Sequence, residues 1–423
     1  MINPITVMTI KCNYAIVAAL LALVSCGGSK QASWADPMSI DERINTREYP
    51  SVFMAWYNID MPQYPVETED QRIAACAKHD IMWEEPLSQL GEGVDLVLGL
   101  TWDHQYHGFA DKFTAASLNR ALVNKKKLLE HNPNMITLFE IRWRDAPMSF
   151  LPEESEWWKR DENGEIVKGW PGGWEPFYML DYENEEFQDN VARQAKIALE
   201  SGVYDGIMLD WSGHLGIIKK IRAAIGDEPL IIVNIHDDIH DGELYKDYIN
   251  GSFMELNPID DKSMPVDELV LFSQEDVNKR SWTKIEEALM WFEDNLCEPQ
   301  INCLEVWGNR KDVRRMRATT TMSLTLSDGY CLYADPNPLK TPDHQHDWYA
   351  MWECDLGKAK AKGVKADKGY WTREYDGGVV IYNPSNNATV TVAFDAPHKR
   401  VSTGEVASQF EIENIDGDIF VKE

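Results

Sequence analysis

Short hydrophobic runs recur along the chain, and segments with helical spacing separate most of them. Eight runs have the length and apolar character of buried strands. They cover residues 51–60, 94–103, 135–145, 205–211, 230–238, 249–257, 301–307 and 328–335. The clearest helical segments are residues 112–131, 186–201 and 310–326. Alternation of strand and helix repeated eight times predicts a (β/α)8 barrel, the TIM-barrel fold of the α/β class.

A doubly wound open sheet is the competing architecture. Such a sheet usually carries a Gly-rich phosphate-binding turn after its first strand. Here that turn contains Met61, Pro62 and Pro65 and no Gly. The first turn therefore favours the closed barrel.

The pattern changes near the C-terminus. Residues 371–384 hold two apolar runs around an Asp-Gly-Gly turn, and residues 388–394 alternate between apolar and polar. These are signals of antiparallel hairpins. We expect the barrel to span residues 50–352 and a small antiparallel β-sandwich module to span residues 353–423.

The N-terminal segment has the pattern of a targeting signal. Lys11 precedes an apolar core at residues 15–24, which is too short to span a bilayer. The tetrapeptide Leu-Val-Ser-Cys ending at Cys26 resembles a bacterial lipobox. We expect a signal peptide at residues 1–25, lipidation of Cys26 and a polar tether at residues 26–49, with an ordinary secretory signal as the alternative. The chain is then a lipoprotein exported to the outer membrane or cell surface, and the lipid anchor is its only contact with the membrane.

Charge and cysteine usage narrow the function classes. The formal net charge is −29, which disfavours nucleic acid as a partner because a nucleic-acid binder needs a basic surface. Five cysteines follow the lipobox and none forms a CxxC pair, so neither a disulfide framework nor a zinc motif is predicted. They are Cys76, Cys297, Cys303, Cys331 and Cys354.

Side-chain parity directs several acidic residues into the barrel. Successive side chains of a strand alternate between its two faces. The run at residues 204–211 ends in Asp210, and an acid does not suit the apolar helix layer, so Asp210 is expected to point toward the barrel axis. The same parity turns Glu255 inward beside Phe253 in the sixth strand and turns Glu305 inward in the seventh.

Asp210 and Glu255 are the best-placed pair for acid–base chemistry. Their strands are two apart, so the backbones lie roughly 10 Å from each other and the carboxyl groups can approach to ~5–6 Å. This is the separation of the two acids in a retaining glycoside hydrolase, in which one acid is ionised and the other protonated. Three alternatives stay open: Asp210 as a helix cap, Glu255 as an ion-pair partner, and Glu305 as the acid instead.

Aromatic and polar residues surround the expected C-terminal mouth of the barrel. Aromatic rings stack on the apolar faces of sugars, and polar side chains bind hydroxyl groups. The connection at residues 146–180 carries four tryptophans and is long enough to form a wall of a cleft. The candidate substrate-binding residues are Trp56, Tyr57, Trp102, Asp103, Arg142, Asn234, His236, Glu305 and Trp307.

Two His- and Asp-rich segments, residues 236–241 and 343–347, raise the question of a metal. Neither has the HExxH spacing of a zinc helix or a clear set of ligands on one strand. No metal or other cofactor is therefore predicted. A serine esterase is disfavoured because the chain lacks a GxSxG motif.

Several segments together resemble the barrel proteins called hypothetical glycoside hydrolase family 15. They are YDGIMLDW at 204–211, MLDYENEEFQDN at 179–190, NGSFMELNP at 250–258, RRMRATTTMSLTLSDGYCLY at 314–333, DLG at 355–357 and WTREYDGGVVIYNPSNNATVTVAF at 371–394. More distantly, the chain is similar to the glycoside hydrolase family 114 barrels, which cut α-linked galactosamine polymers.

The resemblance implies a nucleophilic aspartate on the fourth strand and an acid/base glutamate on the sixth, which are Asp210 and Glu255 here. It also implies an α-linked carbohydrate as substrate. The function expected is that of a retaining glycoside hydrolase acting on an extracellular or periplasmic poly- or oligosaccharide. A non-catalytic glycan-binding surface lipoprotein is the alternative.

Overall fold

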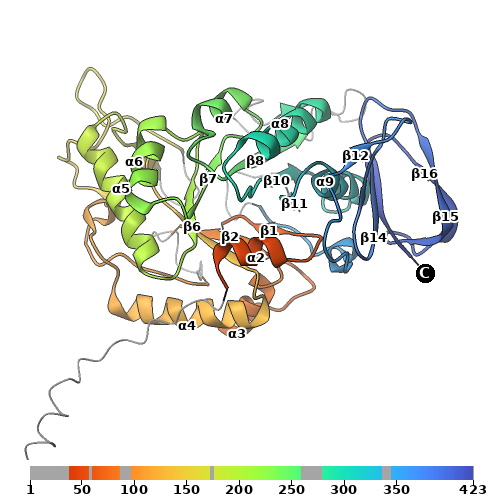
Figure 1. Cartoon of the computed structure of the whole chain (residues 1–423). Coiled ribbons are helices and arrows are strands. Elements are labelled where there is room, and N and C mark those ends of the chain that lie inside the picture. Colours follow the sequence, from red (N-terminus) through yellow and green to blue (C-terminus); the bar gives the residue numbers. More distant parts are fainter. Residues whose placement is uncertain are drawn as a thin grey trace, which may run out of the picture. The chain divides into compact units, whose positions relative to one another are not determined.

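A (β/α)8 barrel forms the centre of the computed structural model (Figure 1). The structure describes residues 38–56, 60–85, 97–171, 176–258, 279–335 and 344–422. The sheet follows the parallel order β1-β2-β3-β6-β7-β8-β10-β11, and a short β9 pairs with β8. It closes where Val52 pairs in parallel with Cys331. The strands are β1 (Phe53–Met54), β2 (Ile81–Glu84), β3 (Ile136–Glu140), β6 (Gly206–Leu209), β7 (Leu230–Asn234), β8 (Gly251–Pro258), β9 (Lys279–Arg280), β10 (Cys303–Trp307) and β11 (Tyr330–Ala334).

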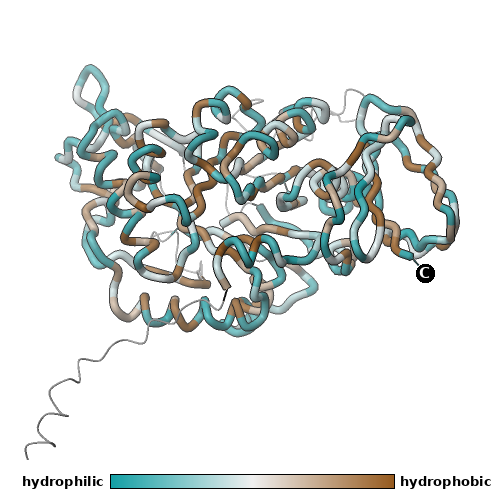
Figure 2. Tube along the Cα trace, viewed as in Figure 1, coloured by the Kyte–Doolittle hydropathy of each residue, from teal (hydrophilic) through white to brown (hydrophobic). Residues whose placement is uncertain are grey.

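Helices surround this sheet (Figure 1). They are α2 (Ile40–Thr46), α3 (Glu69–Cys76), α4 (Ala115–His131), α5 (Glu185–Glu200), α6 (Leu215–Ile225), α7 (Ile239–Tyr245), α8 (Trp282–Asn295) and α9 (Val313–Leu326). The three predicted helical segments are confirmed as α4, α5 and α9. In Figure 2 the central strands are largely hydrophobic, whereas the helices carry hydrophobic and hydrophilic residues, as a layer between core and water requires.

Aromatic side chains fill the inside of the barrel. Phe53 of β1, Trp83 of β2 and Phe253 of β8 are fully buried. The ring centroids of Phe253 lie 5.0 Å from Trp83 and 5.9 Å from Phe53. Rings of this size each bury a large apolar area, so they contribute strongly to the core. The predicted inward direction of Phe253 is confirmed.

The second strand is Ile81–Glu84 and not the predicted run at residues 94–103. The part of that run which the structure describes is a buried loop with Gly99 in the left-handed region at φ 63°. The backbone N–H groups of Leu98 and Gly99 donate to the Glu84 carboxylate at 3.0 and 3.2 Å. The loop is thus apolar because it packs on the barrel, and its amides serve a buried acid instead of a sheet. The other seven predicted strands are confirmed.

The predicted tether differs from the structure after residue 38. Ser39 caps α2 through a capping box with Glu42. Arg43 of this helix is buried and donates to the carbonyl of Met135 at 2.8 Å. The expected signal peptide and Cys26 lie outside the described residues. Within the described ranges, every helix is too short or too polar to cross a lipid bilayer.

The predicted antiparallel C-terminal module is confirmed, and its strands form one sheet in the order β12-β13-β14-β17-β15-β16. They are β12 (Val364–Lys365), β13 (Trp371–Glu374), β14 (Gly378–Asn383), β15 (Val390–Arg400), β16 (Val406–Ile412) and β17 (Asp416–Lys422). The hydrophobic core of the sheet consists of Ile381, Val390, Val392, Phe410, Ile412 and Phe420. The boundary at residue 353 stays a prediction, because residues 38–423 pack as one compact unit that is not divided there.

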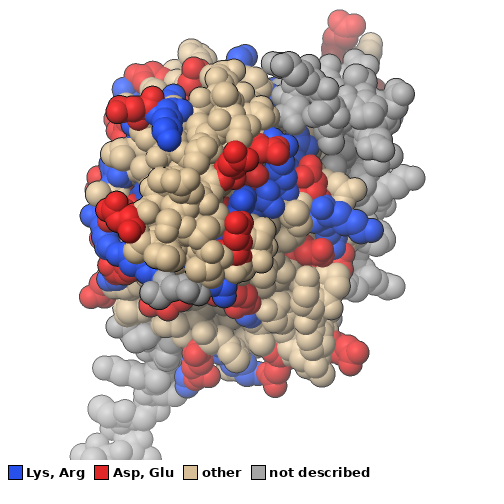
Figure 3. Space-filling view, turned by 90° about the vertical axis from the view of Figure 1, so that its right-hand side faces the viewer, with Lys and Arg blue, Asp and Glu red and all other residues tan. Residues whose placement is uncertain are grey.

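Figure 3 shows the face on the side of this module. Acidic and basic side chains alternate there in small groups, separated by broad uncharged areas. Among the described residues on this face, basic side chains do not join into a continuous patch.

Candidate functional site

Asp210 and Glu255 bind the same side chain at the C-terminal ends of the barrel strands. Asp210 follows β6, Glu255 lies in β8, and Asn234 ends the intervening strand β7. The Asn234 amide nitrogen donates to Oδ1 of Asp210 at 2.8 Å and to Oε2 of Glu255 at 3.0 Å. The third side of this triangle cannot exceed the sum of the other two, so the two oxygens are closer than about 6 Å, near the spacing of a retaining pair.

Burial raises the proton affinity of both carboxyl groups. Only 12% of the Glu255 side chain is exposed. Its pKa is raised to about 8, mainly by burial and further by the nearby carboxylates, and this outweighs the opposing effects of His344 and Asn234. Burial also raises the pKa of Asp210, against the Asn234 hydrogen bond and the charge of Arg142. Glu255 is therefore protonated at neutral pH, as a general acid must be.

Glu305 is close to this pair but is fully buried. It lies opposite Glu255 in the register of β10 and β8. Nδ1 of His344 lies 2.9 Å from both oxygens of Glu305, and Nε2 of His344 lies 4.0 Å from Oε1 of Glu255. The inward direction predicted for Glu305 is confirmed. Both of its oxygens contact His344, and its role in substrate binding stays a prediction.

The predicted His236 also borders the site. Its Nε2 atom lies 3.9 Å from Oε2 of Glu255, whereas His344 lies near the other oxygen, Oε1. His236 lies two residues after the end of β7. Glu255 is thus flanked by two imidazoles from different segments of the chain.

One group of described residues has a spacing that would suit a metal ion. It consists of Glu255, Glu305 and His344, whose possible ligand atoms lie within 4.8 Å of one another. Their contacts are those of an ion pair with two hydrogen bonds. A metal ion would have to break the bonds between Nδ1 of His344 and Glu305. The arrangement is therefore explained by the three side chains themselves.

Trp56 and Arg142 hold a second group of acids beside the site. The indole nitrogen of Trp56 donates to Glu140, and its ring centroid lies 4.7 Å from that of His344. Arg142 pairs with Glu85 and, at 3.4 Å, with Glu140. Arg142 is thus fixed by acids of the protein and acts on Asp210 only through its charge.

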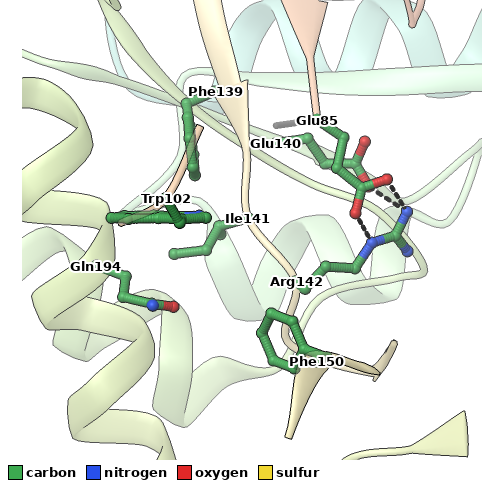
Figure 4. A pocket seen from close by; sticks show the side chains of 8 residues that line it. All are labelled: Glu85, Trp102, Phe139, Glu140, Ile141, Arg142, Phe150 and Gln194. Atoms are coloured by element: carbon green, nitrogen blue, oxygen red, sulfur yellow. Dashed lines mark hydrogen bonds and ion pairs between the residues drawn. The ribbon is translucent and has the colours of Figure 1, made fainter. Parts of the chain in front are cut away.

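A small cavity lies next to these acids (Figure 4). Its lining consists of Glu85, Trp102, Phe139, Glu140, Ile141, Arg142, Phe150 and Gln194. Figure 4 shows the Arg142 guanidinium turned toward Glu85 and Glu140 and away from Trp102 and Gln194. The lining includes neither Asp210 nor Glu255, so this cavity is adjacent to the paired carboxyls and distinct from them.

An aromatic group flanks Asp210 on the other side. The indole nitrogen of Trp143 donates to the carbonyl oxygen of Asp210 at 2.7 Å. The Trp143 ring lies 5.5 Å from Tyr182. The guanidinium of Arg144 lies 4.2 Å above the ring of Trp211. Trp143 and Tyr182 lie just outside the connection at residues 146–180, and Trp211 follows Asp210, so none of these three rings was among the predicted substrate-binding residues. Part of that connection forms a hairpin of β4 (Asp145–Pro147) and β5 (Phe177–Met179).

Backbone strain gathers around the same strand ends. Positive φ is uncommon for residues other than glycine and costs about 1 kcal/mol or more. Among the described residues other than glycine, positive φ occurs at Trp56, Trp211, Ser212, His236, His344 and Ile415. The first four follow β1, β6 or β7, and His344 contacts Glu305. Only Ile415 lies away from the site. Such clustering is typical of sites that hold side chains in fixed positions.

Of the remaining predicted site residues, Trp102 and Asp103 lie away from the strand ends. Trp102 is buried and stacks on a phenylalanine at 4.0 Å. Asp103 is half exposed and pairs with Lys112 at 3.2 Å. Neither is at a strand end, because the second strand runs elsewhere. Trp307 is buried at the end of β10, and Tyr57 lies outside the described residues.

Sequence analysis missed His344 and Glu140 as site residues. His344 belongs to the segment at residues 343–347, which was considered only for metal binding. Glu140 was missed because the third run was extended to Asp145, although β3 ends at Glu140. The alternation of side chains along that run places Glu140 on the inward face, and this pattern could have predicted it as a site residue.

Comparisons with solved structures show the fold. The chain is similar to the noncanonic maltogenic alpha-amylase AmyB of Thermotoga neapolitana (TM-score 0.51, 14% identity, 88% of this chain and 99% of that chain). It is also similar to an alpha-amylase of Malbranchea cinnamomea (TM-score 0.51, 12% identity, 91% and 97%). A third similar structure is Amy13B of Eubacterium rectale (TM-score 0.51, 11% identity, 91% and 99%).

At this low identity, the similarity shows a shared (β/α)8-barrel fold over 88–91% of this chain. Neither protein-family models nor curated proteins give a match to the sequence. The resemblance to hypothetical glycoside hydrolase family 15 and to family 114 therefore stays a prediction.

Proposed function

We propose that this protein is a retaining glycoside hydrolase that cleaves an α-linked poly- or oligosaccharide outside the cytoplasm. The observation that supports this most is the single Asn234 amide that binds both Asp210 and Glu255. It keeps two buried carboxyl groups, both with a raised pKa, within about 6 Å of each other, which is compatible with the spacing that a double displacement uses. The alpha-amylase fold and the flanking aromatic residues agree with it.

In the proposed reaction, the Asp210 carboxylate attacks the anomeric carbon and the glycosidic C–O bond breaks. Glu255 gives its proton to the departing oxygen. In the second step, the Glu255 carboxylate takes a proton from water as the water oxygen attacks the anomeric carbon. The bond to Asp210 then breaks and the carboxylate is restored. Both steps use only groups at the ends of β6 and β8.

The proposal is tested with Asp210→Asn and Glu255→Gln on a library of α-linked glycans. We expect each variant to lose at least about 10³-fold in kcat/KM, because each removes a group that acts directly on the reacting bond. Asp103→Asn is the matched control, since Asp103 is exposed. NMR of the first product should show the anomeric configuration of the substrate. Full activity in a folded Asp210 or Glu255 variant would refute the assignment, as would an inverted product.

The same library tests the alternative of a glycan-binding protein without turnover. That alternative predicts saturable binding to an intact polymer, and no new reducing ends after prolonged incubation. Release of reducing ends by the wild-type protein, but not by Asp210→Asn, would exclude it.

We further propose export as a lipoprotein, based on the lipobox-like tetrapeptide that ends at Cys26. Expressed in a bacterial host with radiolabelled palmitate, the full chain should become labelled and fractionate with membranes. Cys26→Ser should abolish both results. Cys12→Ser, in the same segment, should change neither. Equal labelling of the two variants would contradict lipidation at Cys26.

A further inference from the structure

His344 lies between two buried carboxyl groups. Glu305 is fully buried, and the side chain of His344 is 1% exposed. The imidazole faces Glu305 with Nδ1 and Glu255 with Nε2. Its backbone is in the left-handed region, with φ 58°. The chain therefore accepts a strained conformation that directs this ring toward both acids.

The hydrogen bonds define part of the protonation pattern. Both Glu305 oxygens lie 2.9 Å from Nδ1, so Nδ1 carries a proton and donates it while Glu305 accepts as a carboxylate. Among the described residues, Glu305 forms an ion pair with His344 if the imidazole is protonated. A buried carboxylate is costly unless it is paired and hydrogen-bonded, and a protonated His344 would supply both the charge and the hydrogen bond.

We propose that His344 is a positively charged imidazolium that neutralises Glu305 and so controls when Glu255 can release and recover its proton. His344 acts through Glu255 and is a positioning residue. Among the residues that the structure describes, the other groups that face Glu255 are Asp210 after β6, Asn234 at the end of β7, His236 two residues later, and Glu305 of β10. Of these, Asp210 and Glu305 are acids, so removing the cation leaves Glu255 between two negative charges.

The consequence for catalysis rests on the proposed function. A retaining acid/base residue must be protonated in the first step and ionised in the second. Two neighbouring carboxylates favour only the protonated form. A cation at 4.0 Å from Oε1 lowers the cost of ionising Glu255, so the second step becomes possible near neutral pH.

The charge itself is measured on the wild-type protein, without any variant that needs to fold. In ¹⁵N NMR of the histidine rings near pH 7, both nitrogens of His344 should show the shifts of protonated nitrogen. His346 is an internal reference, because burial lowers its pKa to about 4 and its ring should be neutral. A neutral Nδ1–H tautomer at His344 would overturn the proposal. So would a stoichiometric metal ion, found by elemental analysis, that displaces the His344 proton.

The effect on Glu255 is measured by ¹³C NMR titration of its carboxyl carbon, assigned by its loss in Glu255→Gln. His344→Gln should raise the midpoint by about one unit or more, since a charge within ~4–6 Å shifts a carboxyl pKa by 1–3 units. The double variant with Glu305→Gln removes both charges and should return the midpoint toward the wild-type value. His240→Gln on the exposed side of α7 is the control and should leave it unchanged.

A midpoint that His344→Gln leaves unmoved, or a double variant that does not revert, would contradict the inference. A merely structural role of His344 predicts no such reversal. These titrations need no turnover, so they are independent of the glycosidase test. If Asp210→Asn keeps full activity while the titrations behave as expected, the proposed function fails and the charge on His344 stands.

Discussion

The raised pKa of Glu255 suits an acid catalyst, but it makes the folded protein less stable at high pH. The unfolded chain releases this proton near the ordinary glutamate pKa, whereas burial in the folded protein raises the pKa to about 8. Between these two values, folding requires proton uptake, so the contribution of Glu255 to stability is fully present at low pH and is lost as pH rises toward 8. Active sites commonly carry such a cost.

Glu255→Gln removes this linkage and should stabilise the protein increasingly with pH. Its free energy of unfolding relative to wild type is expected to rise by about 4 kcal/mol from about pH 5 to about pH 9, at about 1.4 kcal/mol per pKa unit. Urea unfolding at both pH values measures the difference. Glu162→Gln, at an exposed position, should show the same difference at both. A Glu255→Gln effect that is independent of pH would mean that the carboxyl ionises freely in the folded state.

Among the elements, α2 is tied to the barrel by one buried aspartate at the start of β6. Asp205 accepts from Arg43 of α2 at 3.1 Å and from Lys125 of α4 at 2.9 Å. The backbone and hydroxyl of Thr137 in β3 also donate to it, at 2.9 and 3.1 Å. The two cations outweigh burial and lower the pKa of Asp205 to about 2. Two helices, α2 and α4, and the strand β3 thus depend on a single carboxylate.

Asp205→Asn should lower the free energy of unfolding at pH 7 by about 3–5 kcal/mol, because it removes the buried carboxylate that pairs with two buried cations. Since the folded-state pKa is lowered, the stabilisation is present above about pH 4 and is lost as pH falls toward 2. The gap between variant and wild type should therefore narrow at about pH 3. Urea unfolding at both pH values checks this, with Asp103→Asn as the exposed control. A gap of equal size at both pH values would contradict the ion-pair explanation.

Elements with a strong periodic signal could be predicted from sequence, and the exceptions have physical causes. Asp210, Glu255 and Glu305 lie in apolar sequence runs in which parity alone fixes the inward face. β2 (Ile81–Glu84) lies between charged neighbours, so the longer apolar run near Leu98 was chosen in its place. For the same reason, Trp102 was predicted at a strand end, whereas it lies in a loop.

The contacts of the site depend on tertiary structure that local pattern does not contain. Asn234 was predicted as a mouth residue within a run at residues 230–238, whereas β7 ends at Asn234 itself. That one amide serves two acids follows only from the geometry of three adjacent strands. His344 is 39 residues from Glu305 in sequence, in a segment without periodicity. No hydrophobic pattern could have paired them.

On the scale of the whole molecule, α9 belongs to the barrel and to the C-terminal module at once. It follows β10 of the barrel, and the module covers its other side (Figure 1). Arg317 of α9 makes two hydrogen bonds with Asp416 of β17, at 3.0 and 2.9 Å. The hydroxyl of Tyr375 donates to the carbonyl of Leu324 at 2.6 Å. A side chain at Gly417 would meet Thr321 at 2.0 Å, so this contact needs glycine.

Because one helix contacts both the barrel strands and the strands of the module, the barrel and the module should unfold together. Arg317→Met leaves Asp416 buried without its partner, so we expect a loss of about 3 kcal/mol in a single transition. Arg314→Met on the same helix is the matched control, because that side chain is 42% exposed and surface pairs contribute about 1 kcal/mol or less. Calorimetry gives the number of transitions, and hydrogen exchange compares amides of β14 and β17 with those of β7. If Arg317→Met weakened protection only in β14 and β17, the module would be an independent attachment, and α9 would not transmit its stability to the strands that hold Asp210 and Glu255.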